Sequence, residues 1–225
     1  GENGAGKSTL IKILGGIYKK DSGQIYVKDQ LAEINNISDA RTYGISIIHQ
    51  ELSLFPNLNV YQNIFMAREQ TVGKIRLDNK THIEKTKNIL KRLEHEIDPE
   101  TLVGELRVGQ QQMIEIARNL VADDLKVLIM DEPTSSLSQQ EVQVLFKIMR
   151  ELTAQGISIV YISHRLEEIM QIGDHVTILR DGKYVSDADV KDIDVPWIVH
   201  EMTGGAKAYP KRETKVDWSK VENVL

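Results

Sequence analysis

The chain contains no cysteine among its 225 residues, which excludes disulfide bonds and thiol chemistry. It also lacks any apolar run near the roughly 18 residues that a membrane-spanning helix needs. Its most apolar segments, 127–130 and 157–162, have only the length of strands. A positive charge excess is missing as well, and the formal net charge of −5 argues against nucleic acid as the main partner.

The composition that remains is that of a globular protein. Hydrophobic residues make up 41% and charged residues 27%, which excludes disordered, collagen-like and coiled-coil classes. Helix and strand patterns alternate at both ends of the chain, whereas the middle is mostly helical. We therefore predict an α/β core formed by 1–50 and 119–203, a helical subdomain at 51–118, and a polar linker at 204–225.

Periodicity and capping signals predict the individual elements. Strands are expected at 24–27, 44–49, 127–130 and 158–162, and a hairpin over 176–185 with Asp181-Gly182 at its turn. Helices are expected at 9–14, 58–70, 79–97 and 110–120, and from the capping box at 138–141 to Gly156. In the first helix, the expected buried side chains are Leu10, Ile13 and Leu14.

The start of the chain fits the phosphate-binding pattern G-x-x-x-x-G-K-[ST]. Glycines in such a loop let backbone N–H groups converge on phosphate oxygens, and the following helix adds the positive end of its dipole. Lys7 is expected to reach the β- and γ-phosphates, and Ser8 to bind Mg²⁺. The alternative is an accidental glycine-rich turn, which the apolar helix directly after the loop argues against. The expected nucleotide-binding residues here are Gly1, Glu2, Asn3, Gly4, Ala5, Gly6, Lys7, Ser8 and Thr9.

Three further candidates follow predicted strands. The strand at 127–130 runs into Asp131 and Glu132, so Asp131 would hold hydrated Mg²⁺ and Glu132 would act as general base on the attacking water. By itself, an acidic pair after a strand is usually a solvated loop, but the upstream phosphate loop favours the functional interpretation. His164 and Gln50 also follow strands, whose carboxyl ends face the ligand crevice in open α/β sheets. Taken singly, a surface histidine and a loop-capping glutamine are the simpler explanations.

Together these motifs resemble an ABC-type ATPase cassette. Their order along the chain matches the family's Walker A, Q-loop, signature, Walker B, D-loop and H-loop, and the resemblance covers nearly the whole chain. The matching positions are 1–8, Gln50, 106–110, 127–132, 136–138 and His164. The stretch 108–118 looks most like the first of two fused cassettes in bacterial carbohydrate importers of the ribose, galactose or xylose type. The basic tail with Tyr209-Pro210, followed by Val221–Leu225, resembles the linker into the second cassette.

The resemblance implies a P-loop NTPase core with an inserted helical subdomain, whose first strands would precede Gly1. It also implies that two cassettes enclose two ATP molecules. Lys7, Glu132 and His164 would be catalytic, and Gln50 would join Ser8 and Asp131 at Mg²⁺ and connect the helical block to the γ-phosphate. The signature residues Leu106, Arg107, Val108, Gly109 and Gln110 would complete the opposite ATP site.

One position departs from the family pattern. Arg107 stands where the signature usually has serine, whose hydroxyl would meet a γ-phosphate. An arginine can donate two hydrogen bonds to phosphate, although it is much larger than serine. Alternatively, the Arg107 side chain points into solvent and has little effect on the ATP site. The sequence leaves both interpretations open.

The function implied by the resemblance is an ATPase that powers sugar import through transmembrane permease subunits, with ATP and Mg²⁺ as its ligands. The second cassette would be fused at the C-terminus, and a periplasmic or extracellular sugar-binding protein would act indirectly. The protein would lie peripherally on the cytoplasmic face of the cell membrane, without binding nucleic acid. Two alternatives remain: an ATP-binding regulatory or structural module with little hydrolysis, and a non-transport ABC-type ATPase.

Overall fold

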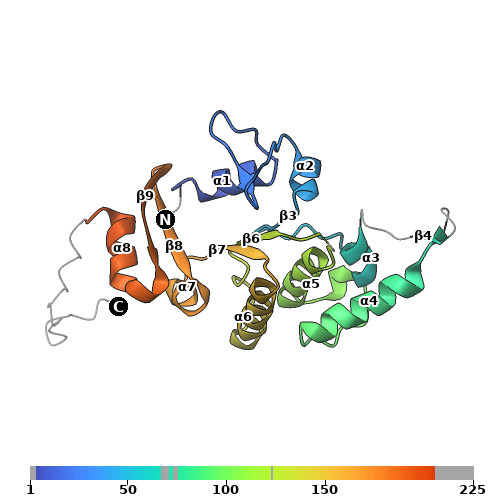
Figure 1. The fold of residues 1–225 in the computed structure, drawn as a ribbon. Helices are drawn as coiled ribbons and strands as arrows, with labels where there is room; N and C mark the ends of the chain where they lie inside the picture. Colours follow the sequence, from blue (N-terminus) through green and yellow to red (C-terminus); the bar gives the residue numbers. More distant parts are fainter. Residues whose placement is uncertain (1–3, 67–70, 73–75, 123, 206–225) are drawn as a thin grey trace, which may run out of the picture.

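A three-stranded parallel sheet lies at the centre of the protein (Figure 1). The computed structural model describes residues 4–66, 71–72, 76–122 and 124–205. Strands β3 (Ile45–Ile48), β6 (Val127–Asp131) and β7 (Ser158–Ile162) are ordered β3-β6-β7. Layers on both faces bury the central strand, which explains why its sequence is a continuous apolar run.

Helices cover both faces of the sheet. Figure 1 shows α1 (Lys7–Leu14) and α2 (Ile37–Thr42) on one face and α5 (Val108–Leu120) and α6 (Gln139–Ala154) on the other. Alternate side chains of β6 therefore enter different clusters. Leu128 and Met130 pack with α5 and α6, whereas Ile129 packs with Ile11 and Ala40 from α1 and α2. The period-two alternation of a strand accounts for this division.

The middle of the chain is mainly helical, as expected. It contains α3 (Val60–Phe65), α4 (Asn79–Arg92), the 3₁₀ turn η1 (Val103–Glu105) and α5. Helix α4 ends well before the predicted residue 97, because Glu94 adopts a left-handed φ of 57° that interrupts the helix. The predicted helix over 58–70 stops at Phe65. Residues 67–70 lie outside the described part, and a short hairpin of β4 (Thr71–Val72) and β5 (Arg76–Leu77) follows.

The predicted C-terminal hairpin is confirmed. Strands β8 (His175–Arg180) and β9 (Lys183–Asp189) flank a two-residue turn in which Asp181 and Gly182 have φ values of 51° and 72°. Two positive φ values define the turn type that suits the twist of a hairpin. Helices α7 (Leu166–Ile172) and α8 (Val195–Thr203), with the 3₁₀ turn η2 (Val190–Asp192), complete this region.

The N-terminal region corrects two expectations. Helix α1 buries Ile11, at 2% exposure, and leaves Leu10 46% exposed. The prediction that Leu10 lies on the buried face is therefore wrong, because the helix turns Ile11 and Leu14 toward the β6 cluster. The strand predicted at 24–27 is present only over β1 (Tyr26–Val27), which forms a short hairpin with β2 (Gln30–Leu31).

Of the predicted linker at 204–225, Gly204 and Gly205 are described and 206–225 lie outside the described residues. Gly204, with a left-handed φ of 72°, ends α8. Within the described ranges, we find no helix that combines the length and the apolar character needed to cross a membrane.

Candidate functional site

The candidate site lies where the three parallel strands end. Gln50 follows β3, and His164 follows β7. Asp131 is the last residue of β6, and Glu132 comes directly after it. The carboxyl ends of parallel strands meet at one edge of the sheet, which brings residues far apart in sequence to the same place. The four positions therefore lie at the same edge of the sheet.

Glu132 and His164 form a close pair in this site. The Oε2 atom of Glu132 lies 3.1 Å from Nδ1 of His164, and the Glu132 side chain is 19% exposed. The Glu132 backbone N–H donates a hydrogen bond of 2.9 Å to the carbonyl of Ile162 at the end of β7. Glu132 also has a left-handed φ of 51°. Strained backbone of this kind persists where surrounding contacts hold it, and it is concentrated at functional sites.

Asp131 provides the electrostatic evidence that the phosphate loop faces these acids. Burial raises the pKa of Asp131 and the charge of Glu132 raises it further, while the positive charges of Lys7 and His49 lower it. Lys7 therefore lies within electrostatic reach of Asp131. Asp131 thus lies beside a second carboxylate in a partly buried position, an arrangement that suits a bound cation.

These residues fit Mg²⁺. Proteins usually hold this ion through one or two carboxylates together with substrate phosphates and water. Asp131 is half-buried and Ser8 is exposed on the first turn of α1, so an oxygen donor from each side is available. In the described ranges, no group of three or more His, Cys, Asp or Glu side chains assembles as a metal site. The donor set suits an ion shared with phosphates better than one enclosed by protein alone.

The described part of the phosphate loop has the expected backbone. Gly4 and Gly6 have φ values of 83° and 93°, and Gly6 precedes α1, so the loop leads directly into a helix N-terminus. A neighbour from the far end of the chain supports the loop: Gly182 N–H donates a 3.3 Å hydrogen bond to the carbonyl of Ala5. A Cβ atom on Gly6 would lie 3.2 Å from Gly182 Cα. The first three candidates, Gly1, Glu2 and Asn3, lie outside the described residues, and Thr9 is exposed in α1.

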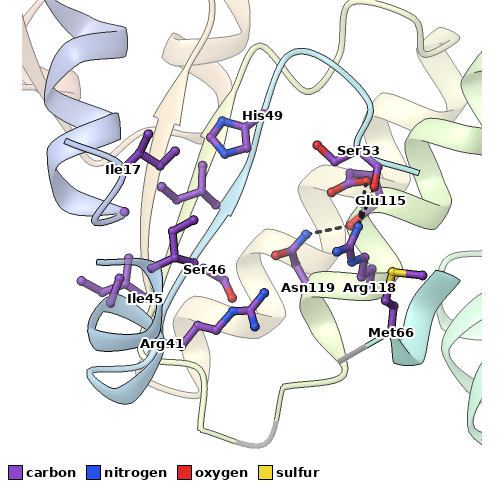
Figure 2. Close-up of a pocket in the computed structure, with 14 residues that line it drawn as sticks. Ile17, Arg41, Ile45, Ser46, His49, Ser53, Met66, Glu115, Arg118 and Asn119 are labelled. Carbon is purple, nitrogen blue, oxygen red and sulfur yellow. Dashed lines mark hydrogen bonds and ion pairs between the residues drawn. The ribbon is translucent and has the colours of Figure 1, made fainter. Parts of the chain in front are cut away.

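A cavity of about 190 Å³, which His49 lines directly before Gln50 in the chain, separates β3 and α2 from α5 (Figure 2). Glu115 of α5 lines it and is only 4% exposed. Burial raises the pKa of Glu115, while Arg118, the Ser53 backbone N–H and His49 lower it. Its Oε2 atom lies 3.9 Å from Nη1 of Arg118 and accepts no hydrogen bond from the described residues. Sequence reasoning missed this carboxylate, whose only signal is one charge within the apolar run of α5.

The signature segment begins helix α5. The helix starts at Val108, two residues earlier than predicted, and Arg107 is its N-cap residue. Arg107 and Val108 are exposed, and Leu106 is half-buried. Gln110 Oε1 accepts a 3.1 Å hydrogen bond from the Arg107 N–H. The structure thus places the signature residues on a surface that is open for contact.

Gly109 joins the signature segment to the loop after β6. A Cβ atom on Gly109 would lie 3.2 Å from the carbonyl oxygen of Ser136. The expected signature and D-loop residues are therefore neighbours within this chain. Any side chain at position 109 would force them apart.

Sequence reasoning also missed Glu168 on α7. This side chain is 7% exposed, and its Oε2 accepts hydrogen bonds from hydroxyl groups of Thr134, Tyr161 and Ser163. Burial acts to raise the pKa of Glu168, but these hydrogen bonds outweigh burial and the pKa is lowered. Its neighbour Glu167 is exposed, so the sequence held no signal to separate the two acids.

Comparisons with known proteins identify the family of the chain. Residues 1–135 match the family described as ABC transporter. Ribose import ATP-binding protein RbsA of Clostridium perfringens (strain SM101 / Type A) is 46% identical and covers 96% of this chain and 43% of that protein. Putative ribose/galactose/methyl galactoside import ATP-binding protein 3 of Burkholderia cenocepacia (strain HI2424) is 47% identical and covers 95% and 42%. The chain thus spans less than half the length of the curated relatives it matches.

Solved structures with a similar fold include a nucleotide-free ATP-binding cassette from an ABC transporter. It has a TM-score of 0.75 at 26% identity and covers 89% of this chain and 84% of that one. The structure of cbiO1 from Clostridium perfringens, part of the ABC transporter complex cbiONQ, has a TM-score of 0.71 at 27% identity and covers 88% of this chain and 78% of that one.

Proposed function

Because the chain belongs to the ABC transporter family, we propose that it binds MgATP and hydrolyses it to power the import of a sugar through a membrane permease. The family membership and the likeness to solved cassettes confirm the predicted P-loop NTPase fold of the ABC type. The observation that carries the proposed activity is the Glu132–His164 pair, held at 3.1 Å beside Asp131. The sugar class is supported by the names of the import proteins that the chain resembles.

Each side chain has a distinct role in the proposed reaction. Lys7 and the backbone N–H groups at the start of α1 hold the β- and γ-phosphates. Glu132 accepts the proton of the attacking water, and His164 fixes the Glu132 carboxylate from the other side. Ser8, Asp131 and Gln50 would hold Mg²⁺, which when bound supplies positive charge against the phosphates.

A second cassette would complete the site. The exposed Arg107 and Val108, together with Leu106, Gly109 and Gln110, would face the nucleotide bound by that cassette. ATP binding would then close the pair and hydrolysis would reopen it, which is a ligand-driven population shift. We place the second cassette C-terminal to this chain, joined through 204–225.

The helical block at 51–118 is the surface that we assign to the permease, because Gln50 connects it to the nucleotide site. The core would comprise 1–50 and 119–203. The cavity that His49 lines, directly before Gln50 in the chain, lies between the sheet and this block (Figure 2), so a change at the nucleotide site can reach a partner seated there. An external sugar-binding protein would act through the permease, and the protein would lie at the cytoplasmic face of the membrane.

Two substitutions in the intact protein test the activity. Lys7→Ala should abolish detectable MgATP binding in calorimetry, since the lysine supplies the charge that faces the phosphates. Glu132→Gln keeps the shape of the side chain and removes the proton acceptor, so ATP should still bind while hydrolysis slows about 10²–10⁴-fold. Unchanged binding in the first variant, or turnover within a few-fold of wild type in the second, would contradict these assignments.

A second candidate function is an ATP-binding regulatory module with little hydrolysis. The observation that favours it is the exposed Arg107 at the signature position. Steady-state phosphate release by the wild-type protein separates the candidates: the transport ATPase requires sustained turnover that Glu132→Gln removes, whereas the regulatory module requires tight binding without such turnover.

A further inference from the structure

One carboxylate oxygen joins the two loops that carry the proposed catalytic pair. Glu168 Oε2 accepts hydrogen bonds from Thr134 Oγ1 at 3.0 Å and from Ser163 Oγ at 2.8 Å. Thr134 lies two residues after Glu132, and Ser163 directly precedes His164. The hydroxyl of Thr134 belongs to the loop of Glu132 and that of Ser163 to the turn of His164. Glu168 therefore bridges both.

The same oxygen is anchored to the protein core. Tyr161 of β7 donates a third hydrogen bond, of 2.7 Å, to Glu168 Oε2. The ring of Tyr161 lies edge-on to Phe146 of α6, with ring centroids 6.1 Å apart, and Phe146 is fully buried. Thr134 and Glu168 are themselves 2% and 7% exposed. The bridge is therefore held by a buried part of the molecule and not by its surface.

We propose that Glu168 is a positioning residue, which holds the loop of Glu132 and the turn of His164 together so that the Glu132 carboxylate faces the attacking water. This proposal rests on the proposed function of the site. Besides Glu168, the Glu132–His164 pair and the backbone hydrogen bond from Glu132 to Ile162 connect the two segments. Both of these contacts are made by Glu132 itself, whereas the contact of Glu168 with Thr134 holds the loop two residues further on.

A carboxylate suits this position for a physical reason. A buried charge is costly unless it is hydrogen-bonded, and hydrogen bonds to an ionised acceptor are roughly twice as strong as neutral ones. Three hydroxyl donors on Oε2, and Arg165 Nη1 at 3.3 Å from Oε1, satisfy the charge of Glu168. The charge in turn orients all three hydroxyls, so loss of the donor in one loop releases that loop specifically.

Two matched substitutions test the positioning role. Thr134→Val and Tyr161→Phe each remove one hydroxyl from the same oxygen and keep the side-chain shape. Only Thr134→Val frees the loop of Glu132, so it should slow single-turnover ATP hydrolysis by the intact protein about 10–100-fold, as expected for misplaced catalytic groups. Its ATP affinity should stay within about twofold, and Tyr161→Phe should leave the rate within about threefold. Thr134→Ser restores the hydroxyl and should restore the rate.

A double-mutant cycle separates positioning from general damage to the fold. If Thr134 acts through Glu132, adding Thr134→Val to Glu132→Gln should change the residual rate by less than about twofold, because the group that it positions is already gone. Equal losses in Thr134→Val and Tyr161→Phe, or multiplied losses in the double variant, would overturn the positioning role. Absence of hydrolysis in the wild type would instead overturn the proposed function, so the two failures are distinguishable.

Discussion

Arg107 occupies the N-cap position of helix α5, but its side chain has no hydrogen-bond acceptor for the first turn of the helix. Arg107→Ser should therefore stabilise the protein. Arg107 has the extended backbone of an N-cap residue, with φ −67° and ψ 154°, and Gln110 already accepts a hydrogen bond from its N–H. A serine hydroxyl there could accept the reciprocal bond from the first turn and complete a capping box. A capping side chain contributes about 1 kcal/mol relative to alanine. Removing a positive charge beside a helix N-terminus adds about 0.3 kcal/mol at an exposed site.

Arg107→Ala is the matched control, because it removes the same charge without supplying a hydroxyl. Calorimetric unfolding of the nucleotide-free intact protein should place the Arg107→Ser transition about 2–4 °C above that of Arg107→Ala, the shift expected per kcal/mol in a domain of this size. Equal midpoints in the two variants would refute the capping argument. If cassettes pair head to tail, Arg107→Ser should also change hydrolysis at the opposite ATP site and leave affinity at the Lys7 loop nearly unchanged. A change confined to the Lys7 site would refute that pairing.

Three further predictions concern other parts of the structure. The pKa of Glu115 is raised in the folded protein, so its contribution to stability is complete below the unfolded-state pKa and falls as pH rises through the folded-state pKa. Glu115→Gln should therefore raise the melting temperature more at pH 8 than at pH 4. An equal change of melting temperature at both pH values would contradict this. Gly44→Ala places a Cβ atom 2.4 Å from the carbonyl oxygen of Asp124 at a φ of 76°, whereas the Cβ atom of Gly156→Ala meets no atom within 4 Å at a φ of 81°. Urea unfolding should therefore show that Gly44→Ala lowers the free energy of unfolding by at least about 1 kcal/mol more than Gly156→Ala does. Asn63→Ala removes a fully buried amide that bonds the 55–59 backbone and should destabilise by about 2–4 kcal/mol in urea; a loss below about 1 kcal/mol would contradict the role of that network.

Local signals in the sequence were sufficient for much of the fold. Asp181-Gly182 predicts a two-residue hairpin turn because both positions tolerate positive φ, and that turn is present. Ser138 and Glu141 predict a capping box, and each side chain bonds the other's backbone N–H at the start of α6. Signals of this kind depend on residues a few positions apart, so they can be recognised without knowledge of the tertiary structure.

Contacts between distant segments were beyond prediction. Glu167 and Glu168 are identical in type and adjacent, yet one is exposed and the other is buried against three hydroxyls from other segments. Leu10 and Ile11 likewise differ in exposure only because one faces the sheet. For the candidate site, the sequence identified Glu132 and His164 but not Glu168, because only the fold brings its partners to it.

The contact of Gly182 with the phosphate loop has a consequence for the order of synthesis. The ribosome delivers Ala5 and Gly6 among the first described residues, but their backbone neighbour follows about 175 positions later. At elongation rates of roughly 5–20 residues per second, the phosphate loop remains without that contact for about 10–35 s. A nascent chain stalled before β8 should therefore contain the folded sheet and its helices, while the phosphate loop still lacks its contact with Gly182. The part of the site made first is completed among the last.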